Sequence, residues 1–183
     1  MSRRPPPAGA ILTPGASADR DHPTLVSLEN GLPELEVVRL TLGTTSVARA
    51  QKLIVAEATE LAQRLEVEPH LIAMGGRSFG GRACSMAVAA GLPAWGLLLL
   101  SYPLHPPGKP DALRVDHFPE IAVPTLFVSG MSDPFGKPDE FDEHLASVGA
   151  SVTTEWVAGA HAPKGKDDEI VAIVRRFLGL ADR

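Results

Sequence analysis

The sequence is poor in cysteine and in basic residues, and both shortages exclude classes of function. Cys84 is the single cysteine among 183 residues, so neither an intrachain disulfide nor a zinc site built from cysteines can form. We therefore expect a reducing, cytoplasmic environment, with Cys84 as a small buried apolar residue. Lysine and arginine together number 17 against 22 acidic residues, and the net charge of −5 argues against nucleic acid or an anionic membrane as partner.

Long apolar segments are also missing. No run approaches the roughly 18 residues that span a membrane, and the first ten residues, MSRRPPPAGA, lack the apolar stretch of a signal peptide. The hydrophobic share of 44% and the charged share of 21% are those of an ordinary globular protein. At this length we expect a single domain over residues 9–183, preceded by a flexible tail of residues 1–8.

Apolar strands alternate with helices along the rest of the chain. We expect strands near residues 9–15, 35–42, 70–74, 96–103, 123–130 and 151–157. Helical spacing of apolar residues predicts helices near residues 46–65, 138–148 and 167–178, with an alanine-rich helix ending near residue 90. This alternation predicts an α/β fold, a three-layer α/β/α sandwich around a mainly parallel sheet of about six strands.

A glycine-rich turn, MGGRSFGGR at residues 74–82, joins the third predicted strand to the alanine-rich helix. The turn lacks the G-x-G-x-x-G spacing of a dinucleotide-binding fingerprint, and the next strand does not end in an acidic residue. Gly75 and Gly80 have the glycine spacing of a P-loop, but Gly81 and Arg82 stand where lysine and serine or threonine belong. Neither phosphate-binding interpretation therefore fits.

The pattern that does fit is G-x-S-x-G, from Gly76 to Gly80 with Ser78 at its centre. In such an elbow the serine occupies a strained strand-to-helix turn, and its neighbours two residues away must be small so that the backbones can pass closely. The turn projects the hydroxyl above the sheet, where the next amide and the helix N-terminus favour a negative oxygen. Ser78 is thus a candidate nucleophile.

A serine of this kind needs a histidine to take its proton, and the chain order at such elbows is serine, then acid, then histidine. His144 and His161 are the histidines that can satisfy this order. His144 lies in a predicted helix among acidic residues, as a solvated surface histidine would. His161 follows the last predicted strand, in AGAHAPKG, and we predict that it is the base.

Asp133 is the predicted acid. It is the one acidic residue between Ser78 and His161 that stands just past an apolar strand, in LFVSGMSDPFG. The surrounding glycine, serine and proline build a tight turn that holds the carboxylate at the edge of the sheet. The alternative is an ordinary Asp-Pro turn. Three residues on three successive loops in the required order predict a catalytic triad of Ser78, Asp133 and His161.

Two backbone amides are predicted to form the oxyanion hole. The first belongs to Phe79, directly after the nucleophile, and the second should lie on the loop after the first strand. On that loop Gly15 allows the chain to turn back, so that the amide of Ala16 or Ser17 can point at the developing oxyanion. Pro14 has no N–H to donate. The alternative is a plain Pro-Gly turn, and we assign the second donor to Ala16.

With these residues in place, the chain resembles the α/β-hydrolase superfamily over nearly its whole length. More narrowly it looks like small bacterial proteins similar to dienelactone hydrolase, a group with a relative in a subunit of a chromatin acetyltransferase complex. The resembling blocks are GGRSFGGRAC, the segment from His105 to Gly136, and AGAHAPKG. Members of the group usually carry His-Gly-Ala-Gly where this chain has residues 14–17, PGAS. The resemblance implies an α/β-hydrolase fold and hydrolase chemistry, without naming a substrate.

The segment from about residue 103 to 122 is too short for a helical cap domain, so we predict an open site. Its walls are predicted to be Tyr102, His105 and Phe135. Arg77 and Arg82 flank the serine, where they either bind a substrate carboxylate or anchor the elbow. A polar cluster at residues 19–22 is more typical of a helix start than of a metal site, and we expect neither metal nor cofactor.

The predicted function is hydrolysis of a small-molecule carboxylic ester or thioester through an acyl-enzyme on Ser78, by a monomer or homodimer. One alternative is a binding or scaffold domain that keeps the fold without its chemistry. Another is a perhydrolase, which uses the same triad with peroxide as the acyl acceptor.

Overall fold

Six parallel strands form the single sheet of the computed structural model, which describes residues 4–181. The strands run in the order β2-β1-β3-β4-β5-β6. Their bounds are β1 Gly9–Thr13, β2 Glu36–Arg39, β3 Ile72–Arg77, β4 Leu97–Leu100, β5 Thr125–Gly130 and β6 Val152–Val157. Every neighbouring pair is parallel, so all carboxyl ends lie at one edge, and the order of strands reverses between β1 and β3. Crevices at such reversal points are where α/β proteins place their ligands.

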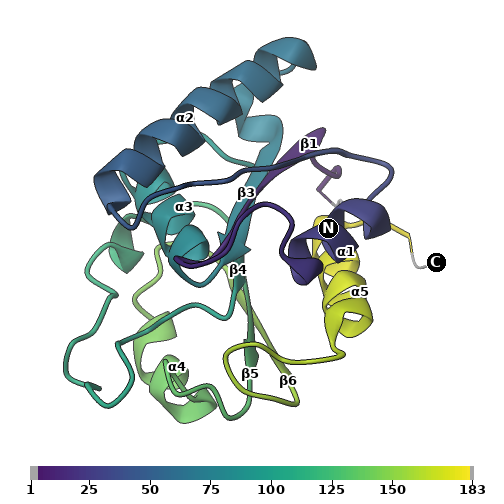
Figure 1. Cartoon of the computed structure of the whole chain (residues 1–183). Coiled ribbons are helices and arrows are strands. Elements are labelled where there is room, and N and C mark those ends of the chain that lie inside the picture. Colours follow the sequence, from purple (N-terminus) through teal and green to yellow (C-terminus); the bar gives the residue numbers. More distant parts are fainter. Residues whose placement is uncertain (1–3, 182–183) are drawn as a thin grey trace.

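Five helices cover the two faces of the sheet (Figure 1). They are α1 Pro23–Gly31, α2 Val47–Arg64, α3 Phe79–Ala89, α4 Pro138–Leu145 and α5 Asp167–Leu178. Buried residues of α2, α3 and α4 pack with one side of the sheet, and those of α1 and α5 pack with the other. These two separate cores confirm the predicted three-layer sandwich. Short 3-10 helices at Pro69–Leu71 and Phe118–Glu120 precede β3 and β5.

The helix ends follow local chemistry that the sequence carries. The Ser46 hydroxyl accepts a hydrogen bond from the amide of Arg49 at the start of α2, as N-cap residues do. Helix α5 begins with three acidic residues and ends with two arginines, an order that complements the helix dipole. Gly179 then takes a left-handed conformation, with φ of 77°, which ends the helix.

Some boundaries differ from those predicted. Helix α1 was not predicted as an element, because its apolar pattern is weak and its N-cap is His22, whose Nδ1 accepts from the amide of Thr24. The strand predicted at residues 35–42 is shorter, at Glu36–Arg39, because it lies at an edge of the sheet and has one neighbour to pair with. Strand β3 starts later than expected and continues through both glycines up to Arg77.

The predicted N-terminal tail packs against the domain over its described part. The indole Nε1 of Trp95 donates a hydrogen bond to the carbonyl of Pro5 at 2.9 Å, and the Arg4 guanidinium lies 4.3 Å from the Trp95 ring centroid. The amide of Ala8 donates to the carbonyl of Leu71. Residues 4–8 therefore make specific contacts with the domain, whereas residues 1–3 lie outside the described part of the chain.

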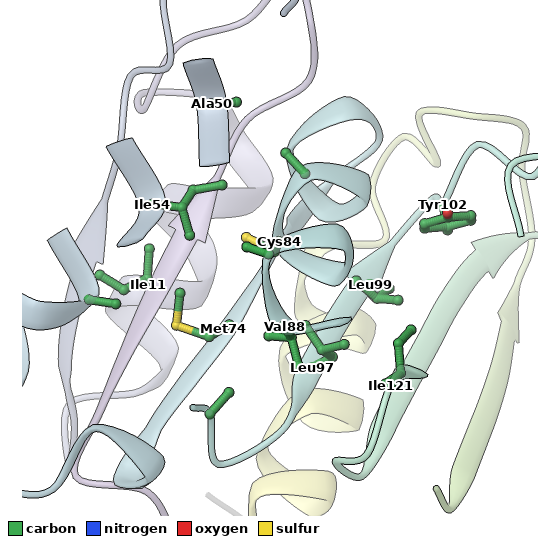
Figure 2. Close-up of a cluster of buried hydrophobic side chains, with 14 of the residues drawn as sticks. Ile11, Ala50, Ile54, Met74, Cys84, Val88, Leu97, Leu99, Tyr102 and Ile121 are labelled. Atoms are coloured by element: carbon green, nitrogen blue, oxygen red, sulfur yellow. The ribbon is translucent and has the colours of Figure 1, made fainter. Parts of the chain in front are cut away.

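Cys84 lies in the core on the face that α2 and α3 cover (Figure 2). Its side chain is fully buried beside Ile54 and Met74, and burial raises the pKa of the thiol to about 12. A thiol with such a pKa stays protonated at neutral pH, so Cys84 acts as a packing residue. Among the helices of residues 4–181, none is long and apolar enough to cross a membrane.

Candidate active site

Ser78 occupies a strained turn between β3 and α3. It is the residue that follows β3 and precedes the first residue of α3, and its φ of 52° and ψ of −120° are rare for a residue with a side chain. Such strain persists only where the surrounding structure enforces it, and it clusters at functional sites. The turn has the geometry that the G-x-S-x-G pattern predicts.

Two glycines of the elbow are required by close contact with the end of β1. A Cβ on Gly76 would overlap the hydroxyl and carbonyl of Thr13, and a Cβ on Gly80 would overlap the carbonyl of Pro14. The elbow therefore lies directly against the loop that follows β1. This contact brings Ser78 and the loop of Ala16 to the crevice where the strand order reverses.

Three side chains from three loops meet in one hydrogen-bonded chain. The Ser78 hydroxyl lies 2.8 Å from Nε2 of His161. Nδ1 of the same ring lies 2.8 Å from Oδ2 and 3.0 Å from Oδ1 of Asp133. Because an ionised carboxylate can only accept, Nδ1 carries the proton and Nε2 is left to accept the Ser78 proton. Asp133 follows β5 and His161 follows β6, so all three lie at the carboxyl edge of the sheet.

The two partners of Ser78 are held by their surroundings. Asp133 is 1% exposed and also accepts a hydrogen bond from the amide of Phe135 at 2.9 Å. The Phe135 ring stacks on the His161 imidazole, with centroids 4.1 Å apart. Nη2 of Arg77 donates to the carbonyl of His161 at 2.6 Å. The imidazole is therefore fixed through its ring, its Nδ1 and its backbone.

The two predicted oxyanion donors lie beside Ser78. Phe79 is the first residue of α3, where a backbone N–H has no acceptor within the helix. Ala16 lines the same cavity as Ser78. Among residues 4–181, neither amide donates a hydrogen bond to another protein group. Both donors are therefore free for a ligand, and the N-terminus of α3 adds a favourable potential for an anion.

Ser78 opens into a cavity of about 410 Å³. Glycine, alanine and other small residues of the loop after β1 form one wall, and larger side chains form the rest. The residues that line it are Gly15, Ala16, Ser17, Ala18, Thr45, Arg77, Ser78, Phe79, Arg82, Pro103, Arg114, Phe135 and His161. Of the three predicted wall residues, Phe135 is present and Tyr102 and His105 are not.

Tyr102 and His105 do not line the cavity because their side chains are buried inside the protein. Tyr102 is fully buried; its hydroxyl donates to the carbonyl of Arg114 at 2.7 Å, and burial raises the pKa of the phenol. His105 is 4% exposed, and its Nε2 lies 3.1 Å from a carboxylate oxygen of Glu140. Both side chains stabilise the loop after β4 instead of facing Ser78.

Arg114 and Pro103 are wall residues that the sequence did not reveal. They lie on the loop between β4 and the Phe118–Glu120 helix, whose path is set by tertiary contacts rather than by a local pattern. The amide of Arg114 donates to the carbonyl of Leu104, and this contact folds the loop back toward the elbow. The prolines of this loop were the signal available in the sequence. They predict that the loop is stiff, but they do not predict which path it takes.

The polar cluster at residues 19–22 has structural partners. Asp21 pairs with Arg39 at 2.9 Å, Asp19 accepts from the amide of Asp21, and His22 caps α1. Over the described residues, no group of three or more histidine, cysteine or acidic side chains is placed to hold a metal ion.

A larger groove, of about 790 Å³, lies between α2 and the end of α3. Within the described part of the chain, it shares no lining residue with the Ser78 cavity, and its walls are mainly alanine and other apolar residues, with Lys52 as the one charged side chain. The described residues that line this groove include Lys52 and Thr59 but no histidine or carboxylate that could activate them. Size alone therefore does not identify the reactive site.

This arrangement of fold and site defines an α/β hydrolase: a parallel sheet with a serine elbow after β3, an acid after β5 and a histidine after β6. Residues 7–168 match the family model described as "Alpha/beta hydrolase domain", and the chain belongs to that family. The match confirms the resemblance to the superfamily and the predicted fold class.

Solved structures with the same fold include several esterases and hydrolases. The chain is similar to Est1E from Butyrivibrio proteoclasticus, with a TM-score of 0.76 and 15% identity over 95% of this chain and 88% of that one. A dienelactone hydrolase from Anabaena variabilis has a TM-score of 0.72 and 15% identity over 96% and 88% of the two chains. An alpha-beta serine hydrolase homologue from Coxiella burnetii gives 0.75 and 16% over 96% and 88%. At these identities the likeness is one of fold.

Proposed function

We propose that this protein is a serine hydrolase that cleaves a carboxylic ester or thioester through an acyl-enzyme on Ser78. Membership of the α/β hydrolase family supports hydrolase chemistry in general. The observation that carries the finer proposal is the chain of contacts from Ser78 through His161 to Asp133, with two heavy-atom separations of 2.8 Å.

Acylation begins when the Ser78 oxygen attacks the carbonyl carbon of the substrate. The hydroxyl proton passes to Nε2 of His161, and Asp133 stabilises the imidazolium that forms. The carbonyl oxygen becomes an oxyanion, which accepts hydrogen bonds from the amides of Phe79 and Ala16. When the tetrahedral intermediate collapses, the alcohol or thiol leaves with the proton from His161, and the acyl group stays on Ser78.

Deacylation repeats the same transfers with water. His161 takes a proton from a water molecule, whose oxygen attacks the acyl carbon and forms a second oxyanion. Collapse of this intermediate returns the His161 proton to the Ser78 oxygen and releases a carboxylic acid. No group other than the triad, the two amides and water is needed for the cycle.

A fluorophosphonate probe tests the proposal, because it reacts with an activated serine and not with an ordinary hydroxyl. We expect a single adduct on the intact protein, mapped to the elbow peptide that contains Ser78, and no adduct on the Ser78→Ala variant. Rapid quenching during turnover of 4-nitrophenyl acetate should trap an acetyl group on the same peptide.

Two other outcomes would replace the proposal. A correctly folded protein that neither reacts with the probe nor turns over any ester would be a binding or scaffold domain. A protein that reacts with the probe but transfers acyl groups to hydrogen peroxide much faster than to water would be a perhydrolase.

A further inference from the structure

Among the residues that the structure describes, three arginines and no acidic residue line the cavity at Ser78. Arg77, Arg82 and Arg114 all contribute to its wall, although the whole chain carries a net charge of −5. The triad carboxylate of Asp133 lies behind His161, with 1% of its surface exposed. The charge of the cavity is thus opposite in sign to that of the protein.

Arg77 differs from the other two because its guanidinium already has a partner. Its Nη2 donates to the carbonyl of His161, and the negative charge of Asp133 partly offsets the burial that lowers the pKa of Arg77. Arg77 therefore holds the loop of His161, and its charge balances the Asp133 carboxylate.

Arg82 and Arg114 have no ion pair or side-chain hydrogen bond within residues 4–181. Nε of Arg82 is buried and lacks any hydrogen-bond partner. Burial, followed by the nearby charge of Arg82, lowers the pKa of Arg114. Two partly desolvated like charges beside each other are unfavourable. An anion between the two guanidinium groups removes this penalty, while the buried Nε marks how far the Arg82 side chain is withdrawn from solvent.

Their scaffold is rigid. Arg82 lies in the first turn of α3, whose N-terminus also favours negative charge. The backbone of Arg114 is held at both ends, since its amide donates to the carbonyl of Leu104 and its carbonyl accepts from the buried hydroxyl of Tyr102. Two arginines on a fixed backbone make a site whose location is set before the ligand arrives.

We infer that the substrate is a small ester or thioester that carries an anionic group, a carboxylate or a phosphate, and that Arg82 and Arg114 bind this group while the carbonyl lies at Ser78. The inference deepens the proposed function and rests on it for the position of the carbonyl. Guanidinium groups bind both kinds of oxyanion through paired hydrogen bonds. The cavity of about 410 Å³ is near the lower end of ligand pockets, which span about 300–1,000 Å³, and it fits a small molecule.

Matched esters test the inference on the wild-type protein. The carboxylate arm uses the mono-4-nitrophenyl ester of glutaric acid against its methyl ester, which has nearly the same shape without the charge. The phosphate arm uses 4-acetoxyphenyl phosphate against phenyl acetate. We expect kcat/KM to favour the anionic member of at least one pair by about tenfold or more, the effect of a charged hydrogen-bond pair.

Variants assign that preference to the two arginines. In Arg82→Gln and Arg114→Gln the anionic-to-neutral ratio of kcat/KM should fall by about tenfold, and Arg82→Lys should retain part of it. Arg49→Gln is the matched control, because Arg49 is an exposed arginine on α2 and should leave the ratio unchanged. A wild-type ratio near one in both arms, or a ratio that survives both glutamine variants, would overturn the inference.

Binding to the Ser78→Ala variant separates this inference from the proposed function. Calorimetry on that variant should give tighter binding of the anionic ester than of its neutral counterpart, and Arg82→Gln in the same background should abolish the difference. Equal binding of both esters would contradict the anion site and leave the proposed mechanism unaffected. Full ester turnover by Ser78→Ala would contradict the proposed mechanism. It would not contradict the anion site, because the calorimetric difference does not depend on turnover.

Discussion

Helix α3 and the residue before it provide two serine–histidine pairs with the same separation. The Ser78 hydroxyl lies 2.8 Å from Nε2 of His161, and the Ser85 hydroxyl lies 2.8 Å from Nε2 of His117. Ser78 faces a cavity, whereas Ser85 is fully buried. A short contact between the two side chains therefore does not by itself make a nucleophile.

The hydrogen-bond donor differs between the two pairs: the serine donates in one and the histidine donates in the other. The single proton of the Ser85 hydroxyl is donated to the carbonyl of Arg82 at 2.9 Å, so this hydroxyl accepts from Nε2–H of His117. Burial, and then the charge of Arg82, lowers the pKa of His117 to about 4. No carboxylate among the described residues accepts from that ring. His117 is therefore a neutral structural donor, whereas His161 is oriented to accept.

The largest expected effect comes from removing each serine in turn. Ser78→Ala should lower kcat for ester hydrolysis by about 10⁴–10⁶-fold, the scale of losses at such triads. Ser85→Ala should change kcat less than about threefold, because Ser85 contacts no reacting atom. It should instead lower the free energy of unfolding by about 1–3 kcal/mol, the cost of unsatisfied buried polar groups.

Stopped assays with 4-nitrophenyl acetate and urea unfolding of the same preparations measure both effects. Loss of activity in a folded Ser85→Ala protein would show that the two pairs are coupled, contrary to the comparison.

The carboxylate behind the histidine gives the next largest effect. Asp133→Asn should lower kcat by about 10⁴-fold, because an amide can donate to Nδ1 and stabilise the wrong tautomer. The pair of His105 and Glu140, 3.1 Å apart, is the internal control. Glu140→Gln should leave kcat within about threefold of wild type, because among the described residues no serine hydroxyl contacts His105 and the amide oxygen of Gln can still accept from the amide of Lys137.

A circular dichroism spectrum of each variant checks the fold before the rates are compared. Equal losses in Asp133→Asn and Glu140→Gln would mean that the histidine–carboxylate contact matters for structure rather than for proton transfer.

Arg77 should give a smaller effect that reports on positioning. Arg77→Met removes the donor to the His161 carbonyl and should lower kcat for a neutral ester by about tenfold, the value of one hydrogen bond to a charged group. KM for that ester should change little, because a neutral ester has no charged group to pair with the Arg77 guanidinium in the cavity wall. Arg49→Met on the exposed surface of α2 is the control.

Arg77→Lys distinguishes charge from geometry, since lysine keeps the charge but not the planar fork. Full recovery by lysine would assign the effect to charge. A rise in KM without a change in kcat would contradict the positioning role.

The order of the triad could be predicted from the sequence because each member follows a strand with a strong apolar pattern. The segment VPTLFVSG predicts the strand before Asp133. The glycines of the elbow pattern are required because Thr13 and Pro14 lie too close to the elbow for a side chain there. The parallel sheet then brings the three loops to one edge whatever the intervening helices do. The roles of these residues stay predictions until the labelling experiment is done.

The cavity wall could not be predicted in the same way. Tyr102 and His105 lie two and five residues past the end of β4, but the backbone of Ser101 takes a φ of 47° and the chain turns inward there. Arg114, nine residues after His105, reaches the site through contacts with Leu104 and Tyr102. These are tertiary contacts between irregular segments, which no periodicity records.

The smallest expected effect concerns the pH dependence of stability at the second pair. His117 has a pKa of about 4 in the folded protein against 6.5 for the free side chain, so between these values the unfolded chain binds more protons. Its contribution to stability is complete above pH 6.5 and is lost as the pH falls toward 4. Because the ring is partly exposed, solvent screening limits this to about 1 kcal/mol.

Urea unfolding at pH 7.5 and pH 4.5 measures that contribution. Wild type should lose about 1 kcal/mol more between the two pH values than His117→Gln, whose amide can still donate to Ser85 but does not titrate. His70→Gln, at an exposed histidine, should behave as wild type. Identical pH dependence in wild type and His117→Gln would mean that His117 titrates normally. The difference between His117 and His161 would then be explained only by the Asp133 carboxylate, which contacts His161.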